Sequence, residues 1–92
     1  MNQNKLNEAE KIVDEVVYNF TSIGKIGSHN NDDGSITIML GDEEVEFKNN
    51  DFEYNIEMIL FQLDGRLKED IIFSHEYVEN DMCNINLKIV GE

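Results

Sequence analysis

The sequence predicts an α+β fold in which an N-terminal amphipathic helix packs on one face of a curved antiparallel β-meander of about five strands. Near the N-terminus, apolar residues recur at helical spacing, whereas most of the remaining chain alternates between apolar and polar residues with period two. Turn-forming residues separate the alternating runs. The 92 residues contain no proline, no low-complexity linker and no internal repeat, so residues 1–92 are expected to form a single domain.

The first predicted element is a helix over about residues 4–22, which Gly24 is expected to end. Charged residues such as Lys5, Glu8 and Lys11 take one side of it. An amphipathic helix is marginally stable by itself in water, so its apolar side needs a covering surface from the rest of the chain. The apolar side is a stripe at i, i+3, i+4 and i+7 spacing: Leu6, Ala9, Ile12, Val13, Val16, Val17 and Phe20.

Strands are expected in the alternating runs, where successive side chains point to opposite faces of a sheet. Their predicted bounds are about 35–40, 43–48, 52–62, 67–78 and 82–90. The turns between them are expected at Gly41-Asp42, Asn49-Asn50, Asp64-Gly65 and residues 79–81. The run "GKIGSH" before the loop "NNDDG" can add a short edge strand.

Residues 51–64 fit two secondary structures. Phe52, Ile56, Ile59, Leu60 and Leu63 also match helical spacing. Closing the four turns at their natural lengths and counting outward pairs apolar residues throughout, whereas a slip of one residue would turn each strand over. This agreement favours a strand that turns Phe52, Tyr54, Ile56 and Met58 toward the core, and a second helix is the alternative.

Net charge limits the classes of partner. The chain carries 20 Asp and Glu against 7 Lys and Arg, a formal charge of −13. Binding to nucleic acid needs cations that displace counterions, and anionic membranes attract basic segments, so both are disfavoured as direct ligands. A protein with a basic surface is the expected partner, because opposite fields steer association. The lone Cys83 and the absence of a signal peptide or membrane span indicate a cytoplasmic protein.

The segment "GDEEVEFKNNDFEYNIE" combines many carboxylates with apolar residues at the spacing expected for packing against a core. In the meander, Glu46 lies opposite Glu53, and Glu53 lies opposite Glu76, on the outer face. Directly opposed like charges cost a sheet something under about 1 kcal/mol per pair. A solvated surface that keeps the protein soluble is one reading, and an ordered acidic array is the other. The predicted partner-binding residues are Asp42, Glu43, Glu44, Glu46, Asp51, Glu53, Glu57 and Glu76.

No motif in the sequence indicates catalysis, a metal or another cofactor. His75 falls on the predicted inner face and is expected to be a core histidine, and Cys83 is expected to be a small buried hydrophobe. His29 lies in a polar loop with no partner at a diagnostic spacing. The protein is therefore expected not to be an enzyme.

In size, charge, proline-free composition and its acidic segment "GDEEVEFKNNDFEYNIE", the chain resembles small phage-encoded inhibitors such as anti-CRISPR proteins, anti-restriction proteins and other DNA mimics. The resemblance implies binding to a CRISPR or restriction nuclease in the groove that nucleic acid would occupy. Immunity or antitoxin proteins that neutralise a basic toxin share the same electrostatics. A non-catalytic adaptor or dimerising subunit is a third possibility, with a predicted apolar interface of Met39, Ile59, Phe61, Ile72 and Met82.

Overall fold

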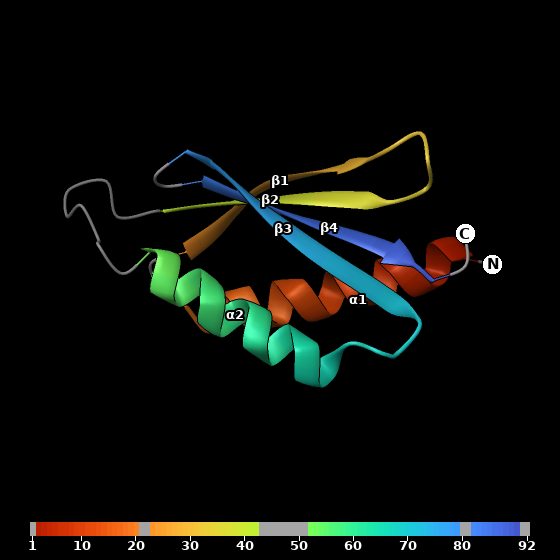
Figure 1. The fold of residues 1–92 in the computed structure, drawn as a ribbon, viewed down its shortest axis with the longest axis horizontal. Coiled ribbons are helices and arrows are strands. Elements are labelled where there is room, and N and C mark those ends of the chain that lie inside the picture. Colours follow the sequence, from red (N-terminus) through yellow and green to blue (C-terminus); the bar gives the residue numbers. More distant parts are fainter. Residues whose placement is uncertain (1, 21–22, 43–51, 80–81, 91–92) are drawn as a thin grey trace.

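The computed structural model describes residues 2–20, 23–42, 52–79 and 82–90. These residues form two layers, with both helices on one side of an open four-stranded antiparallel sheet (Figure 1). The α+β class, the N-terminal helix and the antiparallel sheet are as predicted from the sequence. The elements are α1 (Asn2–Tyr18), β1 (Ile23–Asn30), β2 (Ile36–Asp42), α2 (Phe52–Arg66), β3 (Ile71–Glu79) and β4 (Met82–Ile89).

The strand order β1-β2-β4-β3 differs from a meander, because β4 inserts between β2 and β3. Both β2 and β3 pair antiparallel with β4, so they run parallel to each other on either side of it. Parallel strands cannot be joined by a tight turn and need a crossover connection, which is usually a helix. The α2 helix lies within this connection, on the same side of the sheet as α1 (Figure 1).

The N-terminal helix follows its predicted stripe but ends earlier than expected. Turn hydrogen bonds from the Asn19 and Phe20 amides to the Val16 and Val17 carbonyls close its last turn, at 3.2 and 2.9 Å. The helix therefore ends at Tyr18 rather than near residue 22. The glycine expected to end it, Gly24, is instead a residue of β1.

The tentative edge strand at "GKIGSH" is a full strand, β1, that pairs with β2 as a hairpin. In its loop, the Asn31 amide donates to the Ser35 carbonyl at 2.9 Å and the Gly34 amide donates to the Asn31 carbonyl at 3.0 Å. Gly34 has a φ of 90°, a conformation that costs glycine little because it lacks a Cβ. Interactions between residues close in sequence thus define the loop of the first hairpin.

The strand predicted at 52–62 is wrong, because Phe52–Arg66 is the helix α2. Its buried residues are Phe52, Ile56, Ile59 and Leu63, which are the helical stripe of the alternative interpretation. The period-two interpretation turned Tyr54 and Met58 inward, and these side chains are instead 61% and 37% exposed. The registers counted outward from turns 49–50 and 64–65 fail with it, and the strand predicted at 43–48 lies outside the described residues.

The register of the last hairpin agrees with the one counted from the turn at residues 79–81. Tyr77 lies opposite Cys83, His75 opposite Ile85, Phe73 opposite Leu87 and Ile71 opposite Ile89. The strand predicted from about residue 67 begins at Ile71, after a turn in which the Ile71 amide donates to the Lys68 carbonyl at 3.0 Å. Nearer the turn the expectation is wrong, because Glu79 is still part of β3 and pairs with Met82 after a register shift that follows Tyr77.

The core lies between the sheet and the two helices. Each completely buried aliphatic side chain contributes about 1.5–3 kcal/mol of transfer free energy. Both helices therefore depend on the sheet, and the sheet on them. The buried apolar residues are Leu6, Ala9, Val13, Val16, Val17, Ile23, Ile36, Ile38, Leu40, Phe52, Ile56, Ile59, Leu63, Ile71, Cys83, Ile85, Leu87 and Ile89.

Candidate protein-binding surface

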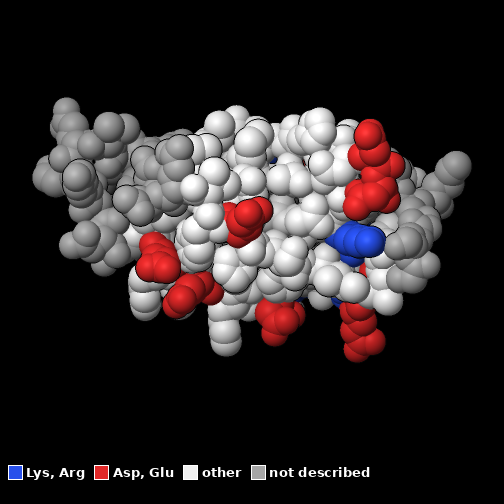
Figure 2. Space-filling model, turned by 45° about the horizontal axis from the view of Figure 1, so that its top comes forward, with Lys and Arg blue, Asp and Glu red and all other residues white. Residues whose placement is uncertain are grey.

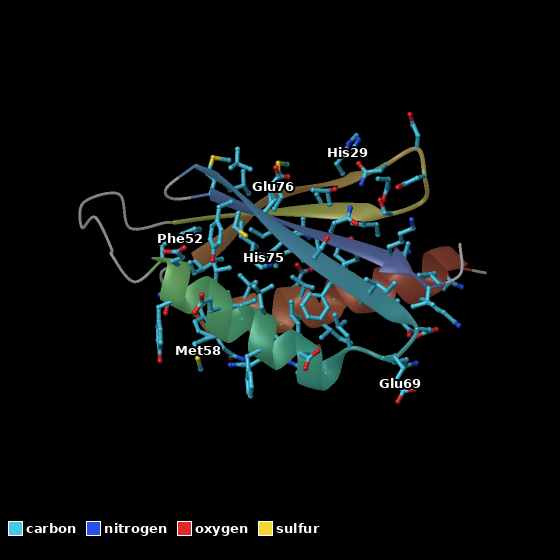
Figure 3. All side chains as sticks on the ribbon, viewed as in Figure 1. His29, Phe52, Met58, Glu69, His75 and Glu76 are labelled. Carbon is cyan, nitrogen blue, oxygen red and sulfur yellow. The ribbon has the colours of Figure 1, made fainter. Side chains whose placement is uncertain are left out.

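The predicted acidic residues do not form one row on the sheet. Glu53 and Glu57 are exposed on α2, in the helix layer. Glu76 lies on β3 and points away from the helices (Figure 3). The proposed opposition of Glu53 and Glu76 across two strands is therefore wrong, because residue 53 belongs to no strand. Asp42 is the last residue of β2, and Glu43, Glu44, Glu46 and Asp51 lie outside the described residues.

The solvent side of α2 carries an exposed apolar stripe. Tyr54, Met58 and Phe61 are 61%, 37% and 75% exposed. Their i, i+4, i+7 spacing aligns them along one face of the helix, opposite the buried face. Met58 points away from the sheet (Figure 3). Large side chains exposed together in this way are unusual for a solvated surface and are typical of the centre of a binding interface.

A row of carboxylates, Glu53, Glu57 and Asp64, runs beside the apolar stripe and is called here the acidic flank. The three residues are spaced at i, i+4 and i+11, which places them on one line along α2. All three are exposed, and none forms an ion pair with another described residue. Asp64 was not among the predicted residues, although the helical alternative would have aligned it with Glu53 and Glu57.

The acidic flank lies on the side of α2 that faces β3. Burial raises the pKa of the Tyr77 hydroxyl on β3, and the charges of Cys83, Glu53 and Glu57 raise it further. The Tyr77 hydroxyl oxygen is buried without a hydrogen-bond partner among the described residues. His75 packs edge-on against Tyr77, with ring centroids 5.5 Å apart. His75 points to the helix side (Figure 3) but is exposed, so its prediction as a core histidine is wrong.

Ion pairs occupy the other side of the helix layer. Arg66 at the end of α2 donates to Glu15 of α1 at 2.6 Å, and Lys68 lies 3.9 Å from Glu8. Lys25 of β1 lies 2.6 Å from Glu10; burial lowers the pKa of Lys25, but hydrogen bonds to Glu10 and Asp14 outweigh this and raise it. These cations pair with acids of α1, whereas no described cation pairs with the acidic flank.

The outer face of the sheet, away from the helices, is nearly uncharged (Figure 2). Among the strand positions whose side chains the structure describes, its charged residues are Glu76 and Lys88. Met39 and Met82 are half-buried there, and Ile72 is 51% exposed. Of the predicted adaptor interface, Met39, Ile72 and Met82 thus share a face. The other two do not, because Ile59 is buried in the core and Phe61 lies on α2.

A hydrogen-bonded network occupies one end of this outer face. The Ser35 hydroxyl donates to Asp33 at 2.6 Å and accepts from the Asn31 and Asn86 amides at 3.0 and 3.3 Å. The same two amides donate to the Thr37 hydroxyl at 2.8 and 3.2 Å. These bonds link the β1–β2 loop to β4 and pair the side chains of Asn31, Ser35, Thr37 and Asn86 with one another.

Reactive groups are few in the described part of the chain. Cys83 is buried opposite Tyr77, and burial raises the pKa of its thiol, which disfavours the reactive thiolate. Among the described residues, no group of three or more His, Cys, Asp or Glu side chains could hold a metal ion. The described helices include none with the length and hydropathy of a membrane span.

An open cleft of about 630 Å³ lies where α1 meets β1. Asp14 and Lys25 line it and are paired with each other at 3.1 Å. Its remaining lining is apolar, so the cleft offers little free polar chemistry. The α2 face, with an exposed apolar stripe beside acids that no described cation pairs with, is the stronger candidate for function. Comparison with known protein families, curated proteins and solved structures finds no match.

Proposed function

We propose that the protein is an acidic inhibitor that binds the basic nucleic-acid-binding surface of an enzyme, such as a CRISPR or restriction nuclease. The observation that carries this proposal is the solvent side of α2, where Tyr54, Met58 and Phe61 lie exposed beside the acidic flank. The chain's formal charge of −13 adds a negative electrostatic field around this contact.

The apolar stripe and the acidic flank have complementary tasks in such an interface. Aromatic residues at the centre of an interface commonly supply most of its binding energy, because they bury large areas in pockets of the partner. Charges at the rim steer association and select the partner. A basic groove that normally holds phosphates provides cations for the acidic flank, and its base-stacking surfaces provide contacts for Tyr54 and Phe61.

The spacing of the carboxylates suits a phosphate-binding groove. Four residues of α-helix rise roughly 6 Å, the axial separation of Glu53 and Glu57. Two phosphate steps along one DNA strand rise roughly 6.8 Å. The mimicry is therefore carried by a helix, in place of the strand expected from the sequence.

The test is inhibition of DNA cleavage by purified nucleases of both classes. Replacing Glu53, Glu57 and Asp64 together with Lys should abolish inhibition and competition with DNA, because attraction becomes repulsion. The control replaces Glu8, Asp32 and Glu69 with Lys, which changes net charge equally away from the flank. If both triple variants lose inhibition equally, only overall charge acts; if neither does, the acidic flank does not bind the enzyme.

The outer face of the sheet supports a second candidate, the adaptor or dimerising subunit. Met39 and Met82 lie near each other at one end of this face, and Ile72 lies opposite Lys88 toward the other end. An apolar interface on this face should persist when salt is added, whereas binding through the acidic flank should weaken. Measuring affinity for an isolated partner at low and at high ionic strength separates the two functions.

A further inference from the structure

The two edges of the sheet differ in how they are protected against pairing with another strand. At the β1 edge, the pairing with β2 shifts between Lys25 and Gly27, which marks a bulge. Lys25 is also a charged residue on the helix side, where it contacts Glu10 at 2.6 Å. Bulges and inward-pointing charges are the usual devices that keep an edge strand from recruiting partners.

The β3 edge has a comparable register shift only near its end, between Tyr77 and Glu79. Its pairing with β4 is regular from Ile71 to Tyr77. Ile72, Ser74, His75 and Glu76 are all exposed. An edge strand presents a row of backbone N–H and C=O groups that no strand of its own sheet satisfies. The structure thus leaves a template for one further strand beside β3 (Figure 1).

The charge beside this edge determines which strand fits. The acidic flank lies on the helix side of β3, with Glu53 and Glu57 close enough to Tyr77 to raise its pKa further than burial alone does. Alternate residues of a strand are roughly 6.8 Å apart and point to the same side. That repeat is close to the roughly 6 Å between Glu53 and Glu57 along α2.

We propose that the partner adds an extended Lys- or Arg-rich segment to the edge of β3. Backbone hydrogen bonds join the segment to β3, and its alternate cationic side chains reach Glu53 and Glu57. This inference rests on the proposed function, since it specifies which part of a basic partner the acidic face holds. Strand addition of this kind gives affinity through the main chain and specificity through alternate side chains.

A second copy of this chain does not suit the site. Two-fold pairing of β3 with β3 would bring two acidic flanks together on the same side of the joined sheet. Those six carboxylates would repel one another in chains that each carry a formal charge of −13. The flank therefore protects the edge against self-association while leaving it open to a cation-rich strand.

The test uses the whole chain and a capped peptide of alternating Lys and Thr, roughly eight residues long. NMR should show amide shift changes that alternate along residues 72–78. Methylating the peptide amides that face β3 should weaken binding by about tenfold or more, whereas methylating the intervening amides should change it by less than about twofold. Glu53→Gln with Glu57→Gln should weaken binding, and Asp32→Asn with Glu69→Gln should not.

Several results would overturn the inference. Equal effects of the two methylated peptides would mean that charge alone holds the peptide. Failure of the peptide to bind, or pairing of β3 with a second copy seen as a dimer in sedimentation, would also reject it. Loss of nuclease inhibition on reversing the acidic flank would still support the proposed function in each case. Conversely, strand addition without any effect of that reversal on inhibition would reject the proposed function and keep the edge site.

Discussion

The solvent side of α2 and the outer face of the sheet are both exposed, yet their chemistry differs. The first has three large apolar residues, Tyr54, Met58 and Phe61, beside three carboxylates that form no ion pair with the described part of the chain. On the second, Glu76 and Lys88 are the charged residues among strand positions whose side chains are described (Figure 2), and hydrogen bonds around Ser35 pair Asn31 and Asn86 with its hydroxyl. The formal charge of −13 of the whole chain is therefore not spread evenly over these two faces.

This contrast shows that charge and apolar exposure have to be considered together. Acidic residues that only maintain solubility have no reason to line up beside exposed aromatic residues. On α1, several acids are instead paired with nearby cations, as Glu15 is with Arg66 at 2.6 Å. The acidic flank forms no such ion pairs with the described residues.

The largest expected effect is a loss of stability when the buried side of α2 is changed. Comparison with a change on the solvent side tests the difference between the two sides. Ile59→Ala should lower the free energy of unfolding by about 2–5 kcal/mol, because it leaves a cavity in the core. Phe61→Ala, two residues away, should change it by no more than about 0.5 kcal/mol. Urea denaturation measures both. Equal effects would mean that residues 52–66 do not bury the helical stripe.

The next largest effect concerns binding by the apolar stripe. If Tyr54 and Phe61 fill pockets of the nuclease, either change to Ala should cost about 2 kcal/mol of binding free energy, measured by calorimetry. Tyr18→Ala is the matched control, since Tyr18 is an aromatic residue of α1 that is 87% exposed. A comparable loss for Tyr18 would show that the contact is not centred on α2.

A smaller effect is expected on the outer face of the sheet. Asn86→Ala removes two of the hydrogen bonds of the Ser35–Thr37 network. The free energy of unfolding should fall by about 1 kcal/mol, the usual net contribution of a hydrogen bond, because Asn31 still donates to both hydroxyls. Nuclease inhibition by the folded variant should be unchanged. A folded Asn86 variant that no longer inhibits would assign function to the outer face instead of α2.

The smallest effect is a pH dependence at the edge of that network. Hydrogen bonds from the Ser35 hydroxyl and backbone amide hold the pKa of Asp33 below its ordinary value of 3.8. Asp33 therefore stabilises the folded state above that value, and this contribution is lost as the pH falls through the lower folded-state pKa. The urea midpoint of Asp33→Ala should converge on that of the wild type at low pH. A difference that stays constant with pH would mean that the charge of Asp33 contributes nothing.

Local patterns in the sequence were sufficient for α1 and for the β3–β4 hairpin. The stripe from Leu6 to Phe20 has one period, and only a helix buries it on one side. In the hairpin, a short turn fixes the register, so Tyr77 meets Cys83 without help from distant residues. Both depend on interactions between residues close in sequence.

The tertiary structure decided α2, and with it the candidate site. Residues 52–58 satisfy period two and the helical period alike, so the sequence pattern did not choose between them. The pairing of β2 with β4 leaves β2 and β3 parallel, and parallel neighbours need a crossover connection rather than a hairpin. That long-range pairing excludes a hairpin at this point, and residues 52–66 form a helix within the crossover, which turns Tyr54 outward and aligns Glu53, Glu57 and Asp64. The sequence by itself determined that the protein is acidic and has an amphipathic N-terminal helix. Only the tertiary structure, through its distant strand pairing, determined where Glu53, Glu57 and Asp64 lie.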